Sequence, residues 1–275
     1  MLDTDSESQR FYREFSTKRP SFSQLYAQRK AQMESRSGPR FRLYHLLREL
    51  NAINDVRPIQ SVLELGTGNG VNLALVHDLL RVENCWGTDV IPRSGEMPAY
   101  IHYVQQDCSN LKAGLSGMQF SVVLMIEVIE HLWDPDTCLE QVRSVLEPGG
   151  RLILTTPNLS SGVNRLALLL GYQPIATEVS TRRTFGNPGP DSVVGHIRVF
   201  TFKALKQFVT FYGFKIEKAY TIPLGGSVFY ESIVGPNAPP RTRGLGKMVV
   251  SADRMFARMG RTLGTNSVLV LSRTD

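Results

Sequence analysis

Residues 61–70 read SVLELGTGNG, which joins an apolar strand pattern to a glycine-rich turn. A helical pattern over 71–80 follows directly. Glycine at a strand-to-helix turn allows the backbone to approach a ligand closely at the N-terminus of the helix. The spacing departs from the dinucleotide fingerprint Gly-x-Gly-x-x-Gly/Ala, because the third glycine, Gly70, comes one residue early. It therefore disfavours an NAD-dependent dehydrogenase.

Strand and helix patterns alternate along the chain from residue 60 onward. Short apolar or β-branched runs predict strands over 61–65, 85–90, 101–104, 120–126, 151–156, 214–222 and 267–272. Helical patterns lie over 71–80, 137–146 and 202–212. Such alternation is typical of parallel sheets with right-handed crossovers. We therefore predict an α/β fold with a doubly wound, seven-stranded, mostly parallel Rossmann-like sheet, N-terminal helices and a lid insertion.

The predicted domain organisation has two parts. Residues 1–50 read as an N-terminal helical extension, and residues 51–275 as the main domain. Within that domain, residues 157–198 form an irregular segment with one short apolar helix over 164–170. A segment of about 40 residues is much longer than a typical connection, which favours a lid or binding role. A basic amphipathic helix is predicted within residues 240–262.

Composition narrows the class of protein. The chain has 275 residues, of which 42% are hydrophobic and 20% charged. These values exclude a disordered chain, a collagen repeat and a disulfide-stapled mini-protein. Three cysteines without zinc-type spacing favour reduced thiols in a cytosolic compartment. The first residues, MLDTDSE, lack the features of a signal peptide. We therefore expect a cytoplasmic protein, peripheral at a membrane surface at most.

Positive charge is concentrated at the two ends of the chain. Residues 1–60 carry 11 Lys/Arg and 7 Asp/Glu, whereas residues 235–275 carry 7 and 2. The middle, residues 61–234, carries 13 and 16 and is net negative, which disfavours a nucleic-acid partner. Basic flanks suit phospholipid headgroups or an anionic substrate, so the 240–262 helix predicts peripheral membrane contact. The alternative is that its apolar stripe packs on the domain.

Acidic residues follow the first three predicted strands. Glu64 lies two residues before Gly66, Asp89 closes the second strand, and Asp107 follows the third. A carboxylate at the end of the second strand can accept hydrogen bonds from ribose hydroxyls. An acid after the third strand can lie beside an adenine. Together with the glycine turn, this pattern predicts a site for an adenosyl cofactor.

The chain resembles the class I S-adenosylmethionine-dependent methyltransferases. The resemblance rests on the 64–70 turn, Asp89, Gln106-Asp107, EVIEHL at 127–132 and EPGG at 147–150, and covers roughly residues 40–222. It implies S-adenosylmethionine as cofactor, its methionine part against the turn, its ribose at Asp89 and its adenine between Asp107 and Cys108. The cofactor-binding residues so implied are Glu64, Gly66, Thr67, Gly68, Asn69, Gly70, Asp89, Val90, Asp107, Cys108 and Glu127.

Two acids and a histidine follow the apolar strand 120–126. Because burying unpaired charge is costly, Glu127, Glu130 and His131 should face the pocket. Here the sequence is similar to the ubiquinone-biosynthesis O-methyltransferases and the small-RNA 2′-O-methyltransferases. That resemblance implies a divalent cation held by Glu127, Glu130, His131 and a later histidine, for which His196 is the candidate. Mg²⁺, Mn²⁺ and Zn²⁺ all remain open.

Two readings without a metal stand beside this one. In the first, His131 is a general base that Glu130 orients. In the second, these side chains only shape the pocket. The predicted catalytic residues are His131, Glu130 and His196.

The predicted reaction is O-methylation of a small-molecule, sugar or lipid-linked hydroxyl. A hydroxyl nucleophile must lose a proton, which requires a base or a metal, whereas an amine acceptor is already neutral. An Asn-Pro-Pro-Tyr motif for amine methylation is absent, and TPN stands at 156–158 instead. The alternatives are an RNA 2′-O-methyltransferase and a non-catalytic cofactor-binding interaction protein. The sequence does not indicate an oligomeric state.

Overall fold

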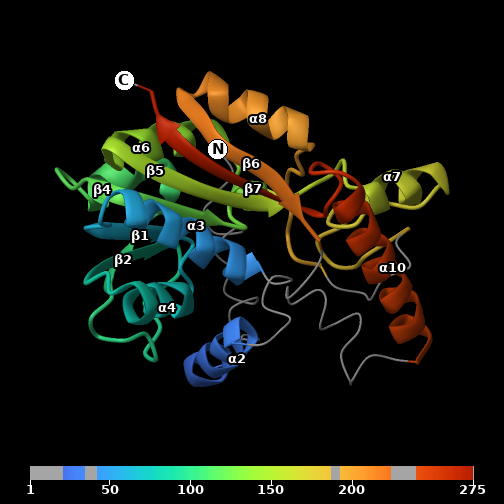
Figure 1. Cartoon of the computed structure of the whole chain (residues 1–275), viewed down its shortest axis with the longest axis horizontal. Coiled ribbons are helices and arrows are strands. Elements are labelled where there is room, and N and C mark those ends of the chain that lie inside the picture. Colours follow the sequence, from blue (N-terminus) through green and yellow to red (C-terminus); the bar gives the residue numbers. More distant parts are fainter. Residues whose placement is uncertain (1–20, 35–41, 187–192, 224–239, 275) are drawn as a thin grey trace.

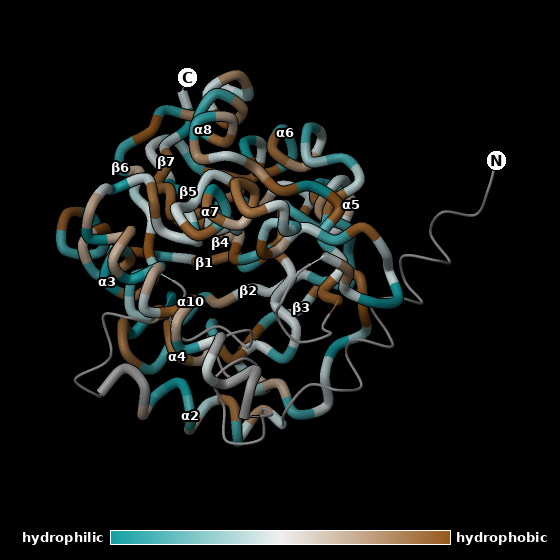
Figure 2. The backbone as a smooth tube through the Cα atoms, turned by 90° about the vertical axis from the view of Figure 1, so that its right-hand side faces the viewer, coloured by the Kyte–Doolittle hydropathy of each residue, from teal (hydrophilic) through white to brown (hydrophobic). Residues whose placement is uncertain are grey.

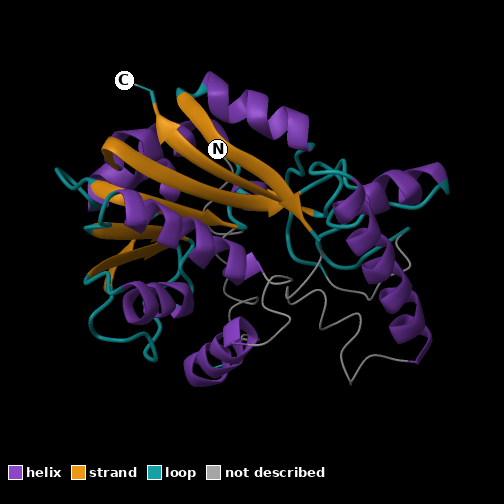
Figure 3. Cartoon of the chain, in the orientation of Figure 1, coloured by secondary structure: helices purple, strands orange, loops and turns teal. Residues whose placement is uncertain are grey.

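A seven-stranded sheet runs through the part of the chain that the structure describes. The structure is a computed structural model and describes residues 21–34, 42–186, 193–223 and 240–274. Helices cover both faces of the sheet (Figures 1 and 3). Among the described residues, none of the helices combines the length and apolar character that crossing a bilayer requires.

The strand order is β3-β2-β1-β4-β5-β7-β6. The final strand, β7, pairs antiparallel with both β5 and β6, and the other neighbours pair parallel. This arrangement confirms the predicted mostly parallel, Rossmann-like sheet. The strand bounds are β1 (Ser61–Leu65), β2 (Asn84–Asp89), β3 (His102–Gln105), β4 (Phe120–Ile126), β5 (Leu146–Pro157), β6 (Phe214–Ile222) and β7 (Asn266–Arg273).

Helices form an outer layer on each face of the sheet. Leucines and valines of α3 and α4 pack in one hydrophobic core, and those of α5, α6 and α8 pack in the other. β4 is buried on both sides, as its continuous apolar sequence predicts. The helix bounds are α2 (Phe22–Glu34), α3 (Arg42–Val56), α4 (Val71–Leu80), α5 (Leu111–Gly114), α6 (Pro135–Val145), α7 (Gly162–Leu169), α8 (Phe202–Phe211) and α10 (Pro240–Met259), with 3₁₀ turns η2 (Cys108–Asn110) and η3 (Ile129–His131).

Several boundaries differ from the sequence prediction for local reasons. β5 begins at Leu146 rather than at residue 151, because Leu146 pairs with Phe120 ahead of an irregularity in the β4–β5 register. α6 begins at Pro135 rather than at residue 137, because the Asp134 side chain accepts a hydrogen bond from Thr137 N and caps the helix. Hydrophobic periodicity in the sequence does not predict helix caps or β-bulges.

The N-terminal helices belong to the same folded unit as the sheet. The predicted boundary at residue 50 falls inside α3, and Leu46 and Leu50 of this helix pack in one core with Val62 of β1. A buried carboxylate, Glu49, ties α3 to β6 by accepting hydrogen bonds from Lys218 Nζ at 2.8 Å and Tyr220 Oη at 2.9 Å. Residues 1–20 and 35–41 of the predicted extension lie outside the described residues. The proposed domain limits stay predictions.

The predicted lid is anchored at its base by buried amides. Asn158 is fully buried and donates from Nδ2 to Thr262 O and Gly264 O, so the segment after β5 is joined to the loop before β7. Asn164 donates to Asn158 O and accepts from Ile175 N. Side-chain amides therefore satisfy backbone groups that no strand or helix satisfies here.

The carboxyl ends of the parallel strands meet at one end of the molecule. Figure 2 looks onto this end, with α7 and α10 lying in front of the sheet. β1 and β4 are neighbours, with Leu65 paired to Met125, so the segments that follow them lie side by side. Ligands of open α/β sheets bind at this edge.

Candidate active site

The turn after β1 requires glycine at three positions. Gly66, Gly68 and Gly70 have φ angles of 64°, 58° and 81°, in the left-handed region that other residues rarely adopt. A Cβ at residue 66 would also lie 2.8 Å from Cγ2 of Val128, in the segment after β4. The turn is therefore tightly packed against the second half of the site.

Glu64 lies beneath this turn and stabilises it. It is buried, and it accepts hydrogen bonds from Thr67 Oγ1 at 2.8 Å and Asn72 Nδ2 at 2.5 Å. Burial raises the pKa of its carboxyl group to about 7, although the two hydrogen bonds oppose the shift. Arg29 of α2 donates to Asn72 Oδ1 from the other side, which sequence reasoning missed. The N-terminal helix α2 therefore reaches the turn through a chain of polar contacts.

Asp89 and Asp107 end β2 and follow β3, as the sequence predicts. Asp89 Oδ2 accepts a hydrogen bond from Gly68 N at 2.9 Å, so it lies directly against the glycine turn. Asp107 caps η2 by accepting from Ser109 N. Cys108 is buried in the core against Cys138, so a cofactor contact at this residue would involve its backbone. The binding roles of these residues stay predictions, as do those of Asn69 and Val90, which are both half-buried.

Glu127 is held by three separate elements. It adopts a left-handed conformation with φ of 55°, which is uncommon for a residue with a side chain. Its carboxylate pairs with Arg42 Nη1 of α3 at 2.8 Å and accepts from Thr155 Oγ1 of β5 at 2.8 Å and Asn266 Nδ2 of β7 at 3.1 Å. Arg42 and Asn266 carry no sequence signal of this role, because both partners are distant along the chain.

Glu130, His131 and His196 form a compact cluster. One candidate ligand atom from each of the three residues lies within 4.8 Å of the other two. Glu130 is fully buried, and its Oε2 accepts from Thr156 Oγ1 at 2.9 Å. Its Oε1 lies 4.0 Å from Nε2 of each histidine and has no hydrogen-bond partner among the described residues. Burial, with the nearby charge of Glu127, raises the pKa of Glu130 well above its usual value.

Backbone carbonyls fix the orientation of both imidazole rings. His131 Nδ1 lies 3.0 Å from Gly195 O, and His196 Nδ1 lies 2.8 Å from Ala176 O. A carbonyl only accepts, so each neutral ring carries its proton on Nδ1 and directs the Nε2 lone pair toward Glu130. The cluster thus presents one carboxylate oxygen and two imidazole nitrogens to a common point.

Three of the four predicted metal ligands therefore come together, and Glu127 does not join them. Its carboxylate is directed to Arg42, Thr155 and Asn266 instead. The predicted orientation of His131 by Glu130 stays a prediction: Glu130 Oε1 lies 4.0 Å from Nε2 of the ring, and the Gly195 carbonyl contacts the ring from its Nδ1 side.

The second histidine reaches the cluster because the end of the lid is tied down. Glu178 accepts hydrogen bonds from the backbone amides of Val194 at 2.7 Å, Gly195 at 2.8 Å and His196 at 3.3 Å. The backbone oxygen of Glu130 accepts from Ile197 N and Arg198 N, which immediately follow. Glu178 was not predicted, because a lone acid in an irregular segment has no distinguishing sequence signal.

Comparison with known proteins assigns the family. The model of a methyltransferase domain matches residues 13–219, well over half of the chain. The chain therefore belongs to the methyltransferase-domain family, and its sheet is that of the class I S-adenosylmethionine-dependent methyltransferases. S-adenosylmethionine is the cofactor of this class. The predicted resemblance to the class I methyltransferases is therefore confirmed.

Curated relatives are similar to part of the chain. A ubiquinone biosynthesis O-methyltransferase of Cereibacter sphaeroides is 35% identical over 105 residues, covering 35% of this chain and 41% of that protein. Another protein of that name, from Parvibaculum lavamentivorans, is 28% identical over 136 residues, covering 44% and 53%. The matched region thus spans about half or less of the length of these relatives.

Solved structures share the fold at low sequence identity. An S-adenosylmethionine-dependent methyltransferase from Clostridium acetobutylicum superposes with a TM-score of 0.51 at 12% identity, covering 84% of this chain and 89% of that one. A SAM-dependent methyltransferase from Archaeoglobus fulgidus gives 0.50 at 14% identity, covering 87% and 96%. At these identities the likeness shows the fold alone.

The buried carboxyl of Glu64 should make stability depend on pH. Its pKa of about 7 in the fold exceeds the value of about 4.5 when unfolded, so its contribution is fully present below pH 4.5 and is lost as pH rises through 7. In the wild type without cofactor, the free energy of unfolding should therefore fall by up to about 3 kcal/mol over this pH range, at about 1.4 kcal/mol per pKa unit. Glu64→Gln should remove this pH-dependent fall, because glutamine does not titrate. Urea unfolding at pH 5, 6, 7 and 8 measures it. The exposed control Glu83→Gln should keep the wild-type slope, and a wild-type slope in Glu64→Gln would contradict the burial argument.

Glu178 should hold the 194–196 backbone in place. Glu178→Gln keeps one acceptor oxygen and replaces the other with an NH2 group that cannot accept, so at least one of the amides of Val194, Gly195 and His196 loses its hydrogen bond and should exchange roughly tenfold faster. Hydrogen–deuterium exchange of a peptide spanning 193–198 measures this, with α6 as the internal reference. Unchanged exchange at 194–196 would show that Glu178 does not position His196.

Proposed function

We propose that this protein transfers a methyl group from S-adenosylmethionine to a hydroxyl of a small-molecule, sugar or lipid-linked acceptor. The observation that carries the proposal is the convergence of Glu130 Oε1 with Nε2 of His131 and His196 at the carboxyl edge of the sheet. A hydroxyl acceptor needs such a proton-accepting or metal-binding group, whereas a neutral amine does not. The partial likeness to proteins named O-methyltransferases supports the same reaction.

The glycine turn and Asp89 are the proposed cofactor site. The turn is followed at once by α4, whose N-terminal amides point toward this edge. Asp89 Oδ2 is engaged by Gly68 N, whereas its Oδ1 has only a 3.5 Å contact with Ile91 N. Asp89 therefore retains capacity to accept hydrogen bonds from ribose hydroxyls. Because Gly66 touches Val128, these residues lie against the segment that carries Glu130 and His131.

Alignment accounts for much of the proposed rate enhancement. Holding a donor and an acceptor in line can contribute roughly 7–11 kcal/mol, provided that the reacting atoms are correctly placed. The fixed rings of His131 and His196 and the buried carboxyl of Glu130 give the acceptor side a defined position. The lid backbone is joined to Glu130 O by two hydrogen bonds, and the side chains of His131 and His196 are only 18% and 9% exposed.

The donor set of the cluster fits a divalent cation. Glu130 Oε1 is a buried oxygen without a hydrogen-bond partner among the described residues, and a cation would satisfy it. Two imidazoles and one carboxylate suit Zn²⁺ or Mn²⁺ better than Mg²⁺, which prefers oxygen ligands. When bound, such a cation would lower the pKa of an acceptor hydroxyl. Glu130, His131 and His196 would hold it.

A metal-free site is the second candidate. The Nδ1 contacts with Gly195 O and Ala176 O turn Nε2 of each ring toward Glu130, an orientation from which an imidazole could take a proton from an acceptor hydroxyl. This observation favours general-base catalysis by either histidine, with the backbone rather than Glu130 orienting the ring. The two candidates differ in whether a metal is required.

Metal analysis should separate these candidates. Protein stripped with a chelator and titrated with Mn²⁺ or Zn²⁺ in a calorimeter should bind one equivalent. His196→Ala and Glu130→Gln should weaken binding at least tenfold, because each removes one of three ligands. His102→Ala, which changes an exposed histidine on β3, is the matched control and should bind like wild type. Absence of binding in the wild type would rule out the metal site and leave the two readings without a metal.

The acceptor class should emerge from transfer of labelled methyl groups. Incubation of the protein with methyl-labelled S-adenosylmethionine and host extract should place label as a methyl ether in the small-molecule, glycan or lipid fraction. Asp89→Ala should lose cofactor affinity and label together, because the ribose contact is removed. Label in RNA would overturn the proposed acceptor, and label on nitrogen would overturn O-methylation.

A further inference from the structure

An apolar surface with basic residues lies on α7 and α10, at the end of the molecule that also carries the site. We call this the α7–α10 surface. Its exposed apolar side chains are Leu168, Leu169, Leu170, Met248, Met255 and Met259, with Leu169 82% and Met259 69% exposed. The exposed basic residues on or next to the two helices are Arg165, Lys247, Arg258 and Arg261. Isolated exposed leucines are common, whereas three successive exposed leucines at the end of α7 and three exposed methionines at helical spacing on α10 mark a candidate interaction surface.

The two helices form one unit. Gly162, the first residue of α7, packs against the ring of Phe256 on α10, and a Cβ at residue 162 would lie 2.2 Å from that ring. Gly162 N also donates to Leu263 O, just after α10, at 2.9 Å. Figures 1 and 2 show α7 and α10 side by side from two directions. The N-terminal end of α7 is therefore fixed against the C-terminal half of α10.

The charge of this surface is of one sign. Among the residues of α7 and α10 whose side chains the structure describes, the sole acid is Asp253. It is fully buried and accepts a hydrogen bond from Thr265 Oγ1, so it does not offset the basic residues outside. A cationic and apolar surface is complementary to a partner that is anionic and apolar.

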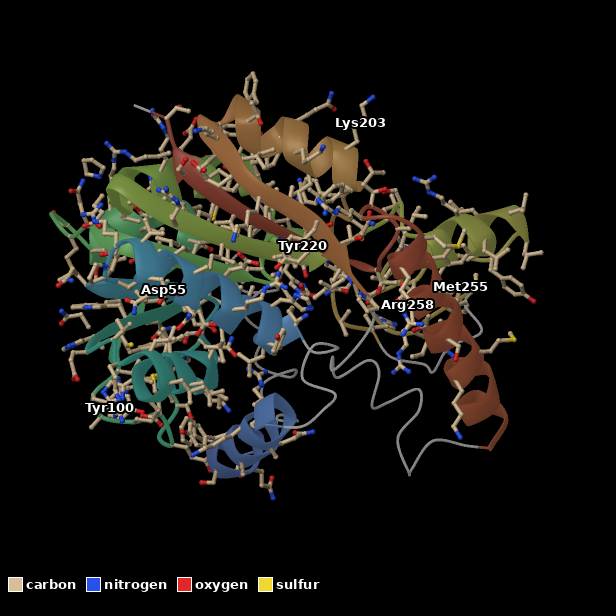
Figure 4. All side chains as sticks on the ribbon, viewed as in Figure 1. Asp55, Tyr100, Lys203, Tyr220, Met255 and Arg258 are labelled. Carbon is tan, nitrogen blue, oxygen red and sulfur yellow. The ribbon has the colours of Figure 1, made fainter. Side chains whose placement is uncertain are left out.

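A surface pocket on α10 is lined by both basic and apolar side chains. Ser251, Arg254, Met255, Arg258 and Met259 line a pocket of about 440 Å³. Figure 4 shows Met255 and Arg258 next to each other on this helix. Guanidinium groups bind phosphate, and methionine adapts to flexible hydrocarbon. A phospholipid presents these two chemistries together, as a phosphate headgroup joined to acyl chains.

We propose that the α7–α10 surface docks on an anionic phospholipid bilayer. Exposed leucines and methionines enter the headgroup region, while arginines and Lys247 contact lipid phosphates. Burial of apolar side chains and electrostatic attraction therefore both contribute to binding. Helix α7 lies within the predicted lid, whose residue His196 completes the Glu130 cluster, so docking would bring the site close to acceptors held in a membrane. This inference goes beyond methyl transfer and does not depend on it.

Vesicle cosedimentation of the cofactor-free full chain tests the proposal. Wild-type protein should bind vesicles of phosphatidylglycerol and phosphatidylcholine, bind pure phosphatidylcholine much less, and dissociate as salt is raised. Arg258→Glu should weaken binding to the anionic vesicles at least about fivefold, because each basic residue near the surface contributes about that factor. Met255→Asp should weaken binding to a similar or greater extent.

Matched controls on α8 separate the surface from general charge and hydrophobicity. Lys203→Glu reverses an exposed charge, and Phe211→Ser removes an aromatic residue that is 81% exposed; both lie away from α10 (Figure 4 labels Lys203). Both controls should bind vesicles like wild type. Thermal unfolding of every variant shows that the fold is retained.

Three results would overturn the proposal. The first is wild-type protein that does not bind anionic vesicles, and the second is Met255→Asp and Arg258→Glu binding as tightly as wild type. The third is sedimentation velocity showing a concentration-dependent dimer that both α10 substitutions abolish, without vesicle binding, which would assign the surface to a second copy of the chain. None of these results bears on the methyltransferase reaction, because no cofactor or acceptor is present.

Discussion

The fully buried carboxyl group of Glu130 joins the parts from which the site is built. Glu130 Oε2 accepts a hydrogen bond from Thr156 Oγ1 of β5. The backbone oxygen of Glu130 accepts hydrogen bonds from two backbone amides at the end of the lid. Its Oε1 faces the Nε2 atoms of both histidines. A buried acid with one unsatisfied oxygen costs free energy, which a proton or a positively charged ligand would offset. This cost is the physical argument for the proposed role of Glu130 in binding a proton or a cation.

A second buried acid stands on the cofactor side of the site. Burial raises the pKa of Glu64 as it does that of Glu130, so both carboxyls hold protons more readily than exposed acids do. The two groups differ in their partners, since Thr67 and Asn72 satisfy both oxygens of Glu64. Glu64 therefore stabilises the glycine turn, whereas Glu130 retains one carboxylate oxygen without a hydrogen-bond partner among the described residues. Similar residues at neighbouring strand ends thus take different roles.

Much of the fold and part of the site could be predicted from the sequence. The seven strands follow from apolar runs such as 120–126, which must be buried on both faces. His131 and Glu130 lie at the edge of the sheet because they directly follow β4. His196 could be proposed only through the family resemblance, since 65 residues separate it from His131 along the chain.

The remaining contacts depend on tertiary packing that periodicity does not encode. Arg42 reaches Glu127 from an N-terminal helix, and Asn266 reaches it from the final strand. Glu178 organises the 194–196 backbone from within an irregular segment. The exposed leucines at the end of α7 also escaped notice, because a short apolar helix in a sequence usually indicates burial. Long-range polar contacts and unpartnered apolar faces become visible only in the structure.

The most direct test of the central claim is an anomalous difference map from crystals grown with S-adenosylhomocysteine and Mn²⁺. The account predicts the adenosyl group at the turn formed by Gly66–Gly70, its ribose at Asp89, and one Mn²⁺ peak within coordination distance of Glu130, His131 and His196. A nucleoside bound elsewhere, with the 66–70 turn unchanged and empty, would contradict the account.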